Sequence, residues 1–218
     1  MEMLGKQMLA ADYGASGGRV MLGSFDGEKI SLGEMHRFAN EPVILNGKDR
    51  STMYWDFLRL FHELKTGMTR AGIMQGRSGA DISSIGVDTW GVDYGLLGRD
   101  GMLLSSPVHY RDARTEGMLK KAFSRMDRER LYEITGSQFM EINTAFQLMA
   151  EQEYREELLE QAESMLLMPD LFSYFLSGEM GSEYTIASTT QMLDAVKKDW
   201  SGEVLEGLGL PSRILKPV

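Results

Sequence analysis

The sequence predicts an α/β fold in which one domain, residues 1–218, combines a sheet core with a helical elaboration. Apolar runs joined by tight turns open the chain, and strands joined in that way pair antiparallel. After about residue 110 the apolar residues recur at helical spacing instead. No repeat or flexible linker interrupts the chain. We therefore expect a strand-rich core over about 1–110 and helices over about 111–218.

Three strands are expected near the N-terminus. Residues 7–11 and 19–25 are mainly apolar, with a Gly/Ser-rich turn between them, and residues 29–38 are the next expected strand. Asp26-Gly27 is a hairpin signal between the second and the third run. Because these connections are short, the three strands should form antiparallel hairpins.

A loop is expected over 39–52, followed by a helix with Asp56 as its N-cap. The apolar positions at helical spacing are Phe57, Leu60, Phe61, Leu64, Met68 and Ala71. The glycines at 76 and 79 should end this helix. Further strands are expected at 82–87, at 93–97 and, after a turn, from 103–104.

The second half contains several helix signals. Met118, Ala122 and Met126 share one face of a helix. Capping residues, proline and glycine mark the other boundaries. The expected starts are Asp127, Asn143 and Pro169, and the expected ends are Gly136, about Arg155, Gly178 and the segment 207–211.

The composition excludes several classes of protein. A formal net charge of −9 provides no basic field for nucleic acid, although backbone amides can still bind a small anion. Without cysteine, the chain has no disulfide, thiolate zinc site or thiol nucleophile. Residues 1–13 lack the pattern of a signal peptide, and no apolar run is long enough to span a membrane. We expect a cytoplasmic protein without nucleic-acid or membrane partners.

Residues 12–19, Asp-Tyr-Gly-Ala-Ser-Gly-Gly-Arg, carry the clearest functional signal. They join two expected strands, and their glycines leave main-chain N–H groups uncovered for a phosphate. Ser16 adds a hydroxyl donor and Arg19 a positive charge. Asp12, at the end of the first strand, is placed to face a magnesium ion through water.

Two common phosphate-binding motifs do not fit this segment. A Walker A loop requires Gly-Lys-Ser/Thr at the start of a helix, and no lysine follows these glycines. A dinucleotide fingerprint also requires a following helix, whereas residues 20–22 are typical of a strand. The phosphate-binding hairpin of actin-like ATPases and sugar kinases fits instead. An ordinary hairpin with a glycine-rich turn remains the structural alternative.

Further segments carry a more specific pattern. They are residues 84–94 (Ser-Ile-Gly-Val-Asp-Thr-Trp-Gly-Val-Asp-Tyr), 109–115 (His-Tyr-Arg-Asp-Ala-Arg-Thr), 135–139 (Thr-Gly-Ser-Gln-Phe) with Asn143-Thr144 and Gln147-Leu148, 167–174 (Leu-Met-Pro-Asp-Leu-Phe-Ser-Tyr), 183–185 (Glu-Tyr-Thr) and 187–191 (Ala-Ser-Thr-Thr-Gln). In order and spacing, over about 10–200, they resemble the FGGY family of carbohydrate kinases and, within it, the rhamnulokinases.

The resemblance implies an RNase H-like (actin-like ATPase) fold with a mixed sheet. The first three strands of this sheet should be antiparallel, and the strands that follow should be parallel. The resemblance also implies transfer of phosphate from ATP, with Mg2+, to a sugar or polyol, here the 1-hydroxyl of L-rhamnulose. L-fuculose and xylulose are the alternative sugars. It also places Gly91 against the sugar, and it assigns the ATP site to Ala15, Ser16, Gly17, Gly18 and Arg19. A glycine lets a polyhydroxylated ligand approach the main chain.

Trp90, Asp93 and Gln138 are expected as further neighbours of the sugar, because aromatic faces cover apolar sugar surface and carboxylates or amides bind hydroxyls. Each has a structural alternative: Trp90 can belong to the core, and Asp88 and Asp93 can form turns.

A structural alternative also exists for the charged residues of the segment 109–115. Besides belonging to the family motif, they can form a local ion-pair cluster of Arg111, Asp112 and Arg114. His36, His62 and His109 show no metal-ligand spacing and are expected to be structural.

The expected catalytic base does not occur in this sequence. In the family a His-Asp-Thr-like segment after the first lobe carries the catalytic aspartate, and no such segment precedes Val218. We therefore expect part of a longer kinase, without the C-terminal domain and inactive alone. An exposed cleft wall could favour a homo-oligomer. The competing hypotheses are a non-catalytic sugar- or nucleotide-binding module and an actin- or chaperone-like ATPase acting on a protein.

Overall fold

The computed structural model describes residues 6–78 and 81–218, and the chain separates into two compact units. The first unit runs up to Glu41 and continues over Asp56–Trp90, and the second comprises Pro42–Trp55 and Gly91–Val218. The boundary between the two units therefore lies at residues 90–91. The segment 42–55 also belongs with the second unit.

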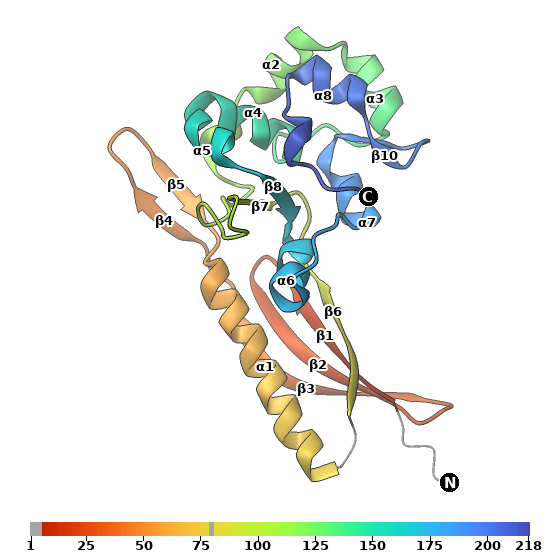
Figure 1. Ribbon diagram of the computed structural model, residues 1–218. Coiled ribbons are helices and arrows are strands. Elements are labelled where there is room, and N and C mark those ends of the chain that lie inside the picture. Colours follow the sequence, from red (N-terminus) through yellow and green to blue (C-terminus); the bar gives the residue numbers. More distant parts are fainter. Residues whose placement is uncertain (1–5, 79–80) are drawn as a thin grey trace. The chain divides into compact units, whose positions relative to one another are not determined.

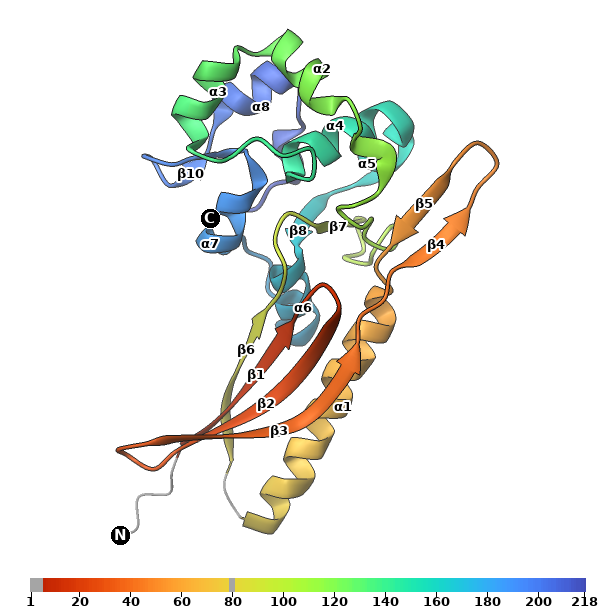
Figure 2. The same cartoon turned by 180° about the vertical axis from the view of Figure 1, so that it is seen from behind.

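The first unit contains a mixed sheet with a long helix on one face (Figures 1 and 2). Strands β1 (Lys6–Tyr13), β2 (Gly17–Phe25) and β3 (Ile30–Ala39) pair antiparallel in succession. Strand β6 (Ile82–Asp88) pairs parallel with β1, so the order in the described residues is β3-β2-β1-β6. The antiparallel start and the parallel continuation of the predicted sheet are confirmed.

Helix α1 (Phe57–Ser78) packs against β2 and β3 through buried side chains at helical spacing, among them Leu60, Leu64 and Ala71. The predicted cap at Asp56 is confirmed, since its Oδ1 accepts the N–H of Arg59 at 3.2 Å. The helix continues through Gly76, so the predicted break there is wrong, and Gly79 lies outside the described residues. A single glycine lowers helix stability by only about 1 kcal/mol, which neighbouring turns can tolerate.

The predicted loop at 39–52 contains a β-hairpin. Strands β4 (Val43–Asn46) and β5 (Ser51–Tyr54) pair antiparallel around a turn in which the Gly47 N–H donates to the Arg50 carbonyl. Hydrogen bonds from Trp55 N–H to the Pro107 carbonyl and from His109 N–H to the Met53 carbonyl, each 2.9 Å, attach this hairpin within the second unit.

The second unit also contains a buried strand pair. Strand β7 (Tyr94–Leu97) pairs antiparallel with β8 (Ser164–Leu167), and every residue of both strands is buried. Strand β8 was not predicted, because a segment of four residues, three of them apolar, lacks the alternation of a half-exposed strand. The strand predicted from residue 103 is wrong, since only a single bridge joins Leu103 to Leu97.

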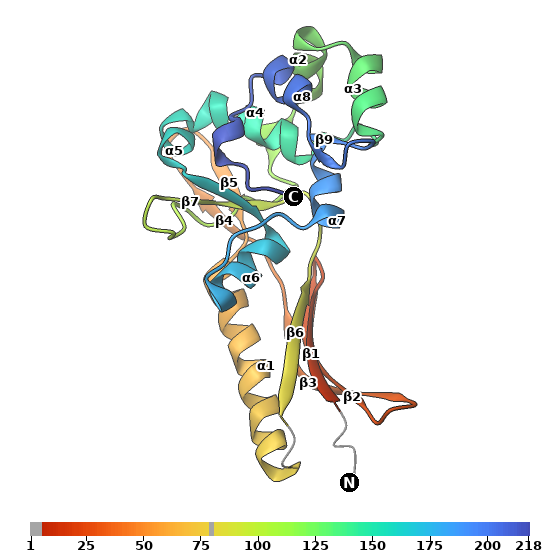
Figure 3. The same ribbon diagram turned by 45° about the vertical axis from the view of Figure 1, so that its right-hand side comes forward.

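Helices form the rest of the second unit (Figure 3). They are α2 (Met118–Arg125), α3 (Arg128–Thr135), α4 (Thr144–Tyr154), α5 (Glu156–Gln161), α6 (Met168–Ser177), α7 (Tyr184–Ala187) and α8 (Gly202–Leu208). Short 3-10 turns occur at Ala113–Thr115, Ser188–Thr190 and Ser212–Ile214, and β9 (Leu193–Asp194) pairs with β10 (Asp199–Trp200). Asp127 caps α3 as predicted, and Gly136 and Gly178 end α3 and α6 with positive φ. No helix in the described ranges combines the length and apolarity needed to cross a membrane.

Gly67 sets how closely α1 approaches the sheet. A Cβ atom at this position would lie 2.4 Å from Cγ2 of Val20 and 2.5 Å from its Cβ. We predict that Gly67→Ala lowers the free energy of unfolding by about 1–3 kcal/mol, the usual cost of overpacking. Gly72→Ala, on the same helix with no atom within 4 Å, should be neutral or stabilise by up to about 1 kcal/mol. Urea denaturation of both variants tests this, and equal effects would contradict it.

Candidate functional site

The glycine-rich turn between β1 and β2 lies on the surface. Gly14, Ala15, Ser16 and Arg19 are exposed, Gly17 is half-buried and Gly18 is buried. A strand leaves the turn, as predicted, and no helix follows it.

Asn40 fixes the shape of this turn, and sequence analysis missed it. The Gly14 N–H donates to the Gly17 carbonyl at 2.8 Å. The buried Asn40 donates its Nδ2 to the Gly14 carbonyl at 2.9 Å and its backbone N–H to the Ser16 carbonyl at 3.1 Å. An asparagine directly after an expected strand was the available signal, since this side chain often bonds to turn backbone.

Gly18 has a steric role that its place in the motif does not reveal. A Cβ atom there would come 2.4 Å from Cζ of Phe38, whose ring packs 5.3 Å from that of Tyr13. Glycine at position 18 was expected for phosphate binding through its main chain, and packing against Phe38 also requires it.

Charged groups surround a hollow of about 580 Å³ beside the turn. Its lining residues are Asp12, Gly14, Ser16, Gly17, Gly18, Arg19, Arg37, Phe38 and Ala39. Ala15, expected at the ATP site, is exposed but does not line this hollow. The guanidinium of Arg19 lies 2.8 Å from a carboxylate oxygen of Asp12. Arg19, expected at the ATP site, and Asp12, expected to face magnesium, therefore form an ion pair with each other.

The position of Asp12 fits a hydrated magnesium ion. Its side chain is 41% exposed, and Asp88 on β6 stands opposite it in the parallel register. Within the described ranges, no three acidic, histidine or cysteine side chains gather as a complete metal cage. Magnesium usually retains several waters and binds one or two carboxylates plus phosphate, so a complete protein cage is not required for such an ion.

The expected sugar residues Gly91 and Asp93 belong to a strained turn in the second unit. The N–H of Asp93 donates to the carbonyl of Gly91 at 2.9 Å, and Val92 between them has a φ of 66°. This combination is a γ-turn with positive φ, a rare and strained conformation, and it is least favourable for a β-branched residue.

Asp93 is fully buried, and its carboxylate accepts hydrogen bonds from its own unit. Oδ2 accepts from Nε1 of Trp55 at 2.6 Å and from the N–H of Tyr110 at 3.2 Å. Oδ1 accepts from Nε2 of Gln147 at 2.9 Å. This geometry does not support the predicted sugar contact and favours the structural alternative for Asp93.

Thr189, which sequence analysis missed, lies against Gly91. A Cβ atom on Gly91 would come 3.1 Å from Cγ2 of Thr189 and 3.2 Å from its Oγ1. Packing within the unit therefore gives a reason for glycine here, independent of any ligand. The Thr189 Oγ1 also accepts the N–H of Val92 at 3.1 Å.

The other two expected sugar residues lie in different surroundings. Trp90 is half-buried and belongs to the first unit, so it is neither a fully buried core residue nor a freely exposed one. Gln138 is exposed in the second unit. It lines a separate hollow of about 820 Å³ with Arg128, Glu129, Tyr132, Glu133, Gly136 and Phe139.

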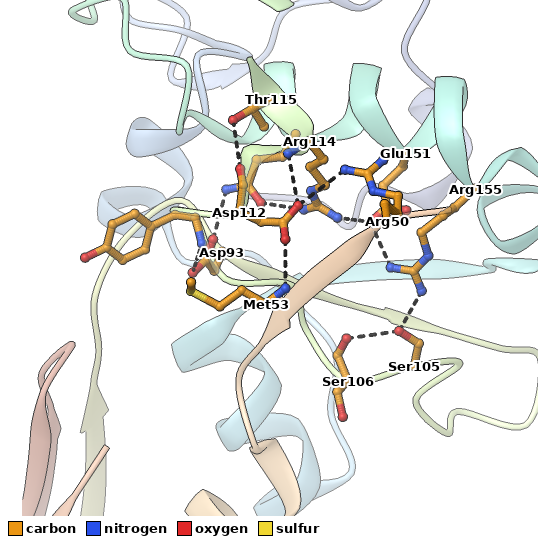
Figure 4. A network of polar contacts seen from close by, with 12 residues as sticks. Arg50, Met53, Asp93, Ser105, Ser106, Asp112, Arg114, Thr115, Glu151 and Arg155 are labelled. Carbon is orange, nitrogen blue, oxygen red and sulfur yellow. Dashed lines mark hydrogen bonds and ion pairs between the residues drawn. The ribbon is translucent and has the colours of Figure 1, made fainter. Parts of the chain in front are cut away.

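Asp112 and Arg114 of the arginine motif belong to a buried polar network (Figure 4). Arg114 pairs with Glu151, each side chain being 3% exposed, and donates to Oε1 of Gln147 at 2.7 Å. Asp112 accepts from the backbone N–H groups of Met53 at 2.7 Å and Arg114 at 3.0 Å. One predicted alternative was a local ion-pair cluster of Arg111, Asp112 and Arg114. The pairing in that cluster is wrong, because the guanidinium of Arg114 pairs with the carboxylate of Glu151 on α4.

His109 is a structural residue, in agreement with its expected role. Its ring stacks on that of Trp55 at 4.0 Å, and its Nδ1 accepts the N–H of Arg111 at 3.0 Å. Burial, followed by the charge of Arg111, lowers the pKa of His109 from 6.5 to about 4. The neutral ring is therefore the folded form at neutral pH.

This shift predicts a pH-dependent stability. Between pH 6.5 and 4 the unfolded chain binds a proton that folded His109 does not, so the free energy of unfolding should fall as the pH is lowered. His109→Asn, which keeps an acceptor near the Nδ1 position, should weaken this dependence. Urea titrations across this range provide the measurement. A variant at position 109 with the unchanged protein's pH dependence would refute the assignment.

Comparison with known proteins relates this geometry to one family. Residues 7–218 match the N-terminal domain of the FGGY family of carbohydrate kinases. A rhamnulokinase from Pectobacterium atrosepticum is 41% identical over 212 residues, which cover 96% of this chain and 41% of the relative. One from Oceanobacillus iheyensis is 40% identical over 210 residues, with coverage of 96% and 43%. The chain thus spans about two fifths of these relatives.

Solved structures show the same fold at much lower sequence identity. A xylulose kinase from Rhodospirillum rubrum matches with a TM-score of 0.82 at 13% identity, covering 98% of this chain and 43% of that one. The predicted α/β fold of the actin-like ATPase type is confirmed. The family match over nearly the whole chain supports the motif-based assignment, and this chain belongs to the FGGY family of carbohydrate kinases, matching its N-terminal domain.

Proposed function

We propose that the protein carrying this chain is a kinase that transfers the γ-phosphate of ATP to the 1-hydroxyl of L-rhamnulose. The observation that carries the proposal is an exposed glycine-rich hairpin turn in an FGGY chain that is 41% identical to a rhamnulokinase. Structural relatives at 13% identity support the fold and do not bear on the sugar.

The nucleotide phosphates bind at the turn in this proposal. Ala15, Ser16, Gly17 and Gly18 provide main-chain and hydroxyl donors, and Arg19 provides a guanidinium beside the hollow. Asp12 would hold a hydrated Mg2+ ion, which neutralises charge on the phosphates when bound. Arg19 would then divide its interactions between Asp12 and the phosphates.

The sugar binds at the main chain of Gly91 in this proposal, with Gln138 of the same unit as a further contact. The exposed amide of Gln138 can bind sugar hydroxyls. Asp93 contributes through the conformation of the turn, since its carboxylate is buried and hydrogen-bonded to protein groups.

Phosphoryl transfer needs a carboxylate that can accept the hydroxyl proton. The bond from the γ-phosphorus to the ADP oxygen breaks, the sugar oxygen bonds to phosphorus, and its proton passes to the base. Asp93 is buried and Asp12 is paired with Arg19, so neither is suited to this role. We propose that an aspartate beyond these 218 residues is the base, and that the chain alone is inactive.

A ketose panel tests the proposed reaction. The full-length protein should consume ATP with L-rhamnulose at the highest kcat/KM, measured by coupled ADP release. L-fuculose, xylulose, ribulose and glycerol serve as competing substrates, and a preference for any of them would refute the sugar assignment. Residues 1–218 alone should bind ligand without turnover. Turnover by this chain at a rate comparable to the full protein would refute the missing-base proposal.

Arg19→Gln tests the nucleotide assignment. Loss of a charge-assisted hydrogen bond should weaken Mg–ATP binding by about tenfold or more, while sugar affinity stays unchanged. Arg99→Gln makes the same charge change at an exposed position of the second unit and should leave ATP affinity unchanged. Calorimetric titration with Mg–ATP measures both. Equal ATP affinity for the two variants would contradict phosphate binding by Arg19.

A further inference from the structure

The turn at Gly91–Asp93 is held in a conformation that its sequence disfavours. Val92 has a φ of 66°, a region in which β-branched side chains are strained. Strain of this kind persists only where surrounding contacts over-determine the backbone, and it concentrates at functional sites. The contacts that hold Val92 are therefore candidates for positioning residues.

Side chains bind both polar backbone groups of Val92. Its N–H donates to Oγ1 of Thr189 at 3.1 Å. Its carbonyl accepts from Oγ1 of Thr144 at 2.7 Å and from Nε2 of Gln147 at 3.3 Å. Thr144 and Gln147 come from α4, and Thr189 comes from the 3-10 turn Ser188–Thr190.

The hydroxyl of Thr189 is itself oriented. It donates to the Ile186 carbonyl at 2.8 Å, so an oxygen lone pair remains to accept the Val92 N–H. The residues that follow are also fixed, because buried Gln191 donates to Oγ1 of Thr135 at 2.7 Å and accepts from Nδ2 of Asn143 at 2.7 Å.

We propose that Thr189 is a positioning residue for the sugar. Its hydroxyl holds the γ-turn at Val92, and its methyl-bearing side packs against Gly91, so the main chain at Gly91 keeps the orientation that the ligand meets. This inference rests on the proposed function, since it takes Gly91 as the sugar contact. Thr189 acts through the turn and is not assigned a contact with the sugar.

Three substitutions separate the hydroxyl from packing. Thr189→Val keeps the shape and removes the acceptor of the Val92 N–H, so affinity for L-rhamnulose should fall about tenfold. Thr189→Ser keeps the hydroxyl and should bind the sugar within about twofold of the unchanged protein. Thr190→Val is the matched control. The hydroxyl of this buried neighbour bonds the Ala187 carbonyl and the Met192 N–H, so its loss should lower stability without changing sugar affinity.

Relieving the backbone strain at Val92 distinguishes a Thr189 hydroxyl that positions the turn from one that only stabilises the fold. Glycine adopts positive φ without a steric penalty. In a Val92→Gly background, Thr189→Val should therefore reduce sugar affinity by less than about threefold. Full-length proteins would be titrated calorimetrically with L-rhamnulose, with Mg–ATP binding recorded as a check of folding.

The outcomes are distinguishable. A tenfold loss for Thr189→Val, rescue by serine and a smaller loss beside glycine at position 92 support the inference. Equal sugar affinity for Thr189→Val and the unchanged protein overturns it while leaving the proposed function intact. The same loss in both backgrounds, or an equal loss for Thr190→Val, also overturns it. If Thr189→Val does not fold, a loss of sugar affinity greater than about twofold for Thr189→Ser, which keeps the hydroxyl, overturns it, and an affinity within about twofold supports it. No binding of L-rhamnulose by the unchanged protein overturns the proposed sugar and the inference together.

Discussion

The buried carboxylate of Asp93 joins separate segments of the second unit. It accepts hydrogen bonds from Trp55 at the end of the 42–55 hairpin, from the backbone of Tyr110 and from Gln147 on α4. The Asp93 carbonyl also accepts the N–H of Met168 at the start of α6. A carboxyl group removed from water must keep such partners, because losing one leaves a buried polar oxygen without a hydrogen bond. This requirement fixes the backbone that follows Gly91.

Gln147 extends the same constraint to the arginine motif. Its amide nitrogen binds Asp93 and its amide oxygen accepts from Arg114, which is paired with Glu151. Such a buried polar network favours one arrangement, because other packings would leave more of its groups without partners than the two that lack one within the described residues, Arg114 Nε and Glu151 Oε2. The motif at 109–115 is therefore connected to the strained turn through Asp93 and Gln147, and His109 contributes a neutral ring stacked on Trp55.

Local patterns predicted much of the fold. Short turns between apolar runs identified β1 to β3, and Asp56, Asp127 and Gly178 marked helix boundaries correctly. These signals depend on residues near one another in the chain. The hairpin β4–β5 was missed although its residues have strand propensity, because its attachment to residues 107–109 is a long-range contact. Strand β8 was missed for a similar reason, since only pairing with β7 distinguishes it from a helix segment.

The site was less predictable than the fold. The exposed turn could be located from its glycines, but its anchor, Asn40, lies 26 residues from Gly14. Thr189 lies 97 residues from Val92, and no local pattern predicts positive φ at a valine. Asp93 was expected to contact the sugar, because a sequence does not distinguish a carboxylate that faces a ligand from one enclosed by Trp55 and Gln147. In each case the missing information is which distant side chain supplies the hydrogen bond.

A crystal structure of the full-length protein with L-rhamnulose, Mg2+ and a non-hydrolysable ATP analogue would test the central claim most directly. The account predicts analogue phosphates within hydrogen-bond distance of the main chain at residues 15–18 and of Arg19, with the sugar against Gly91. Phosphates bound away from this hairpin, or a sugar seated in the hollow between Arg128 and Phe139 without contact to Gly91, would contradict it.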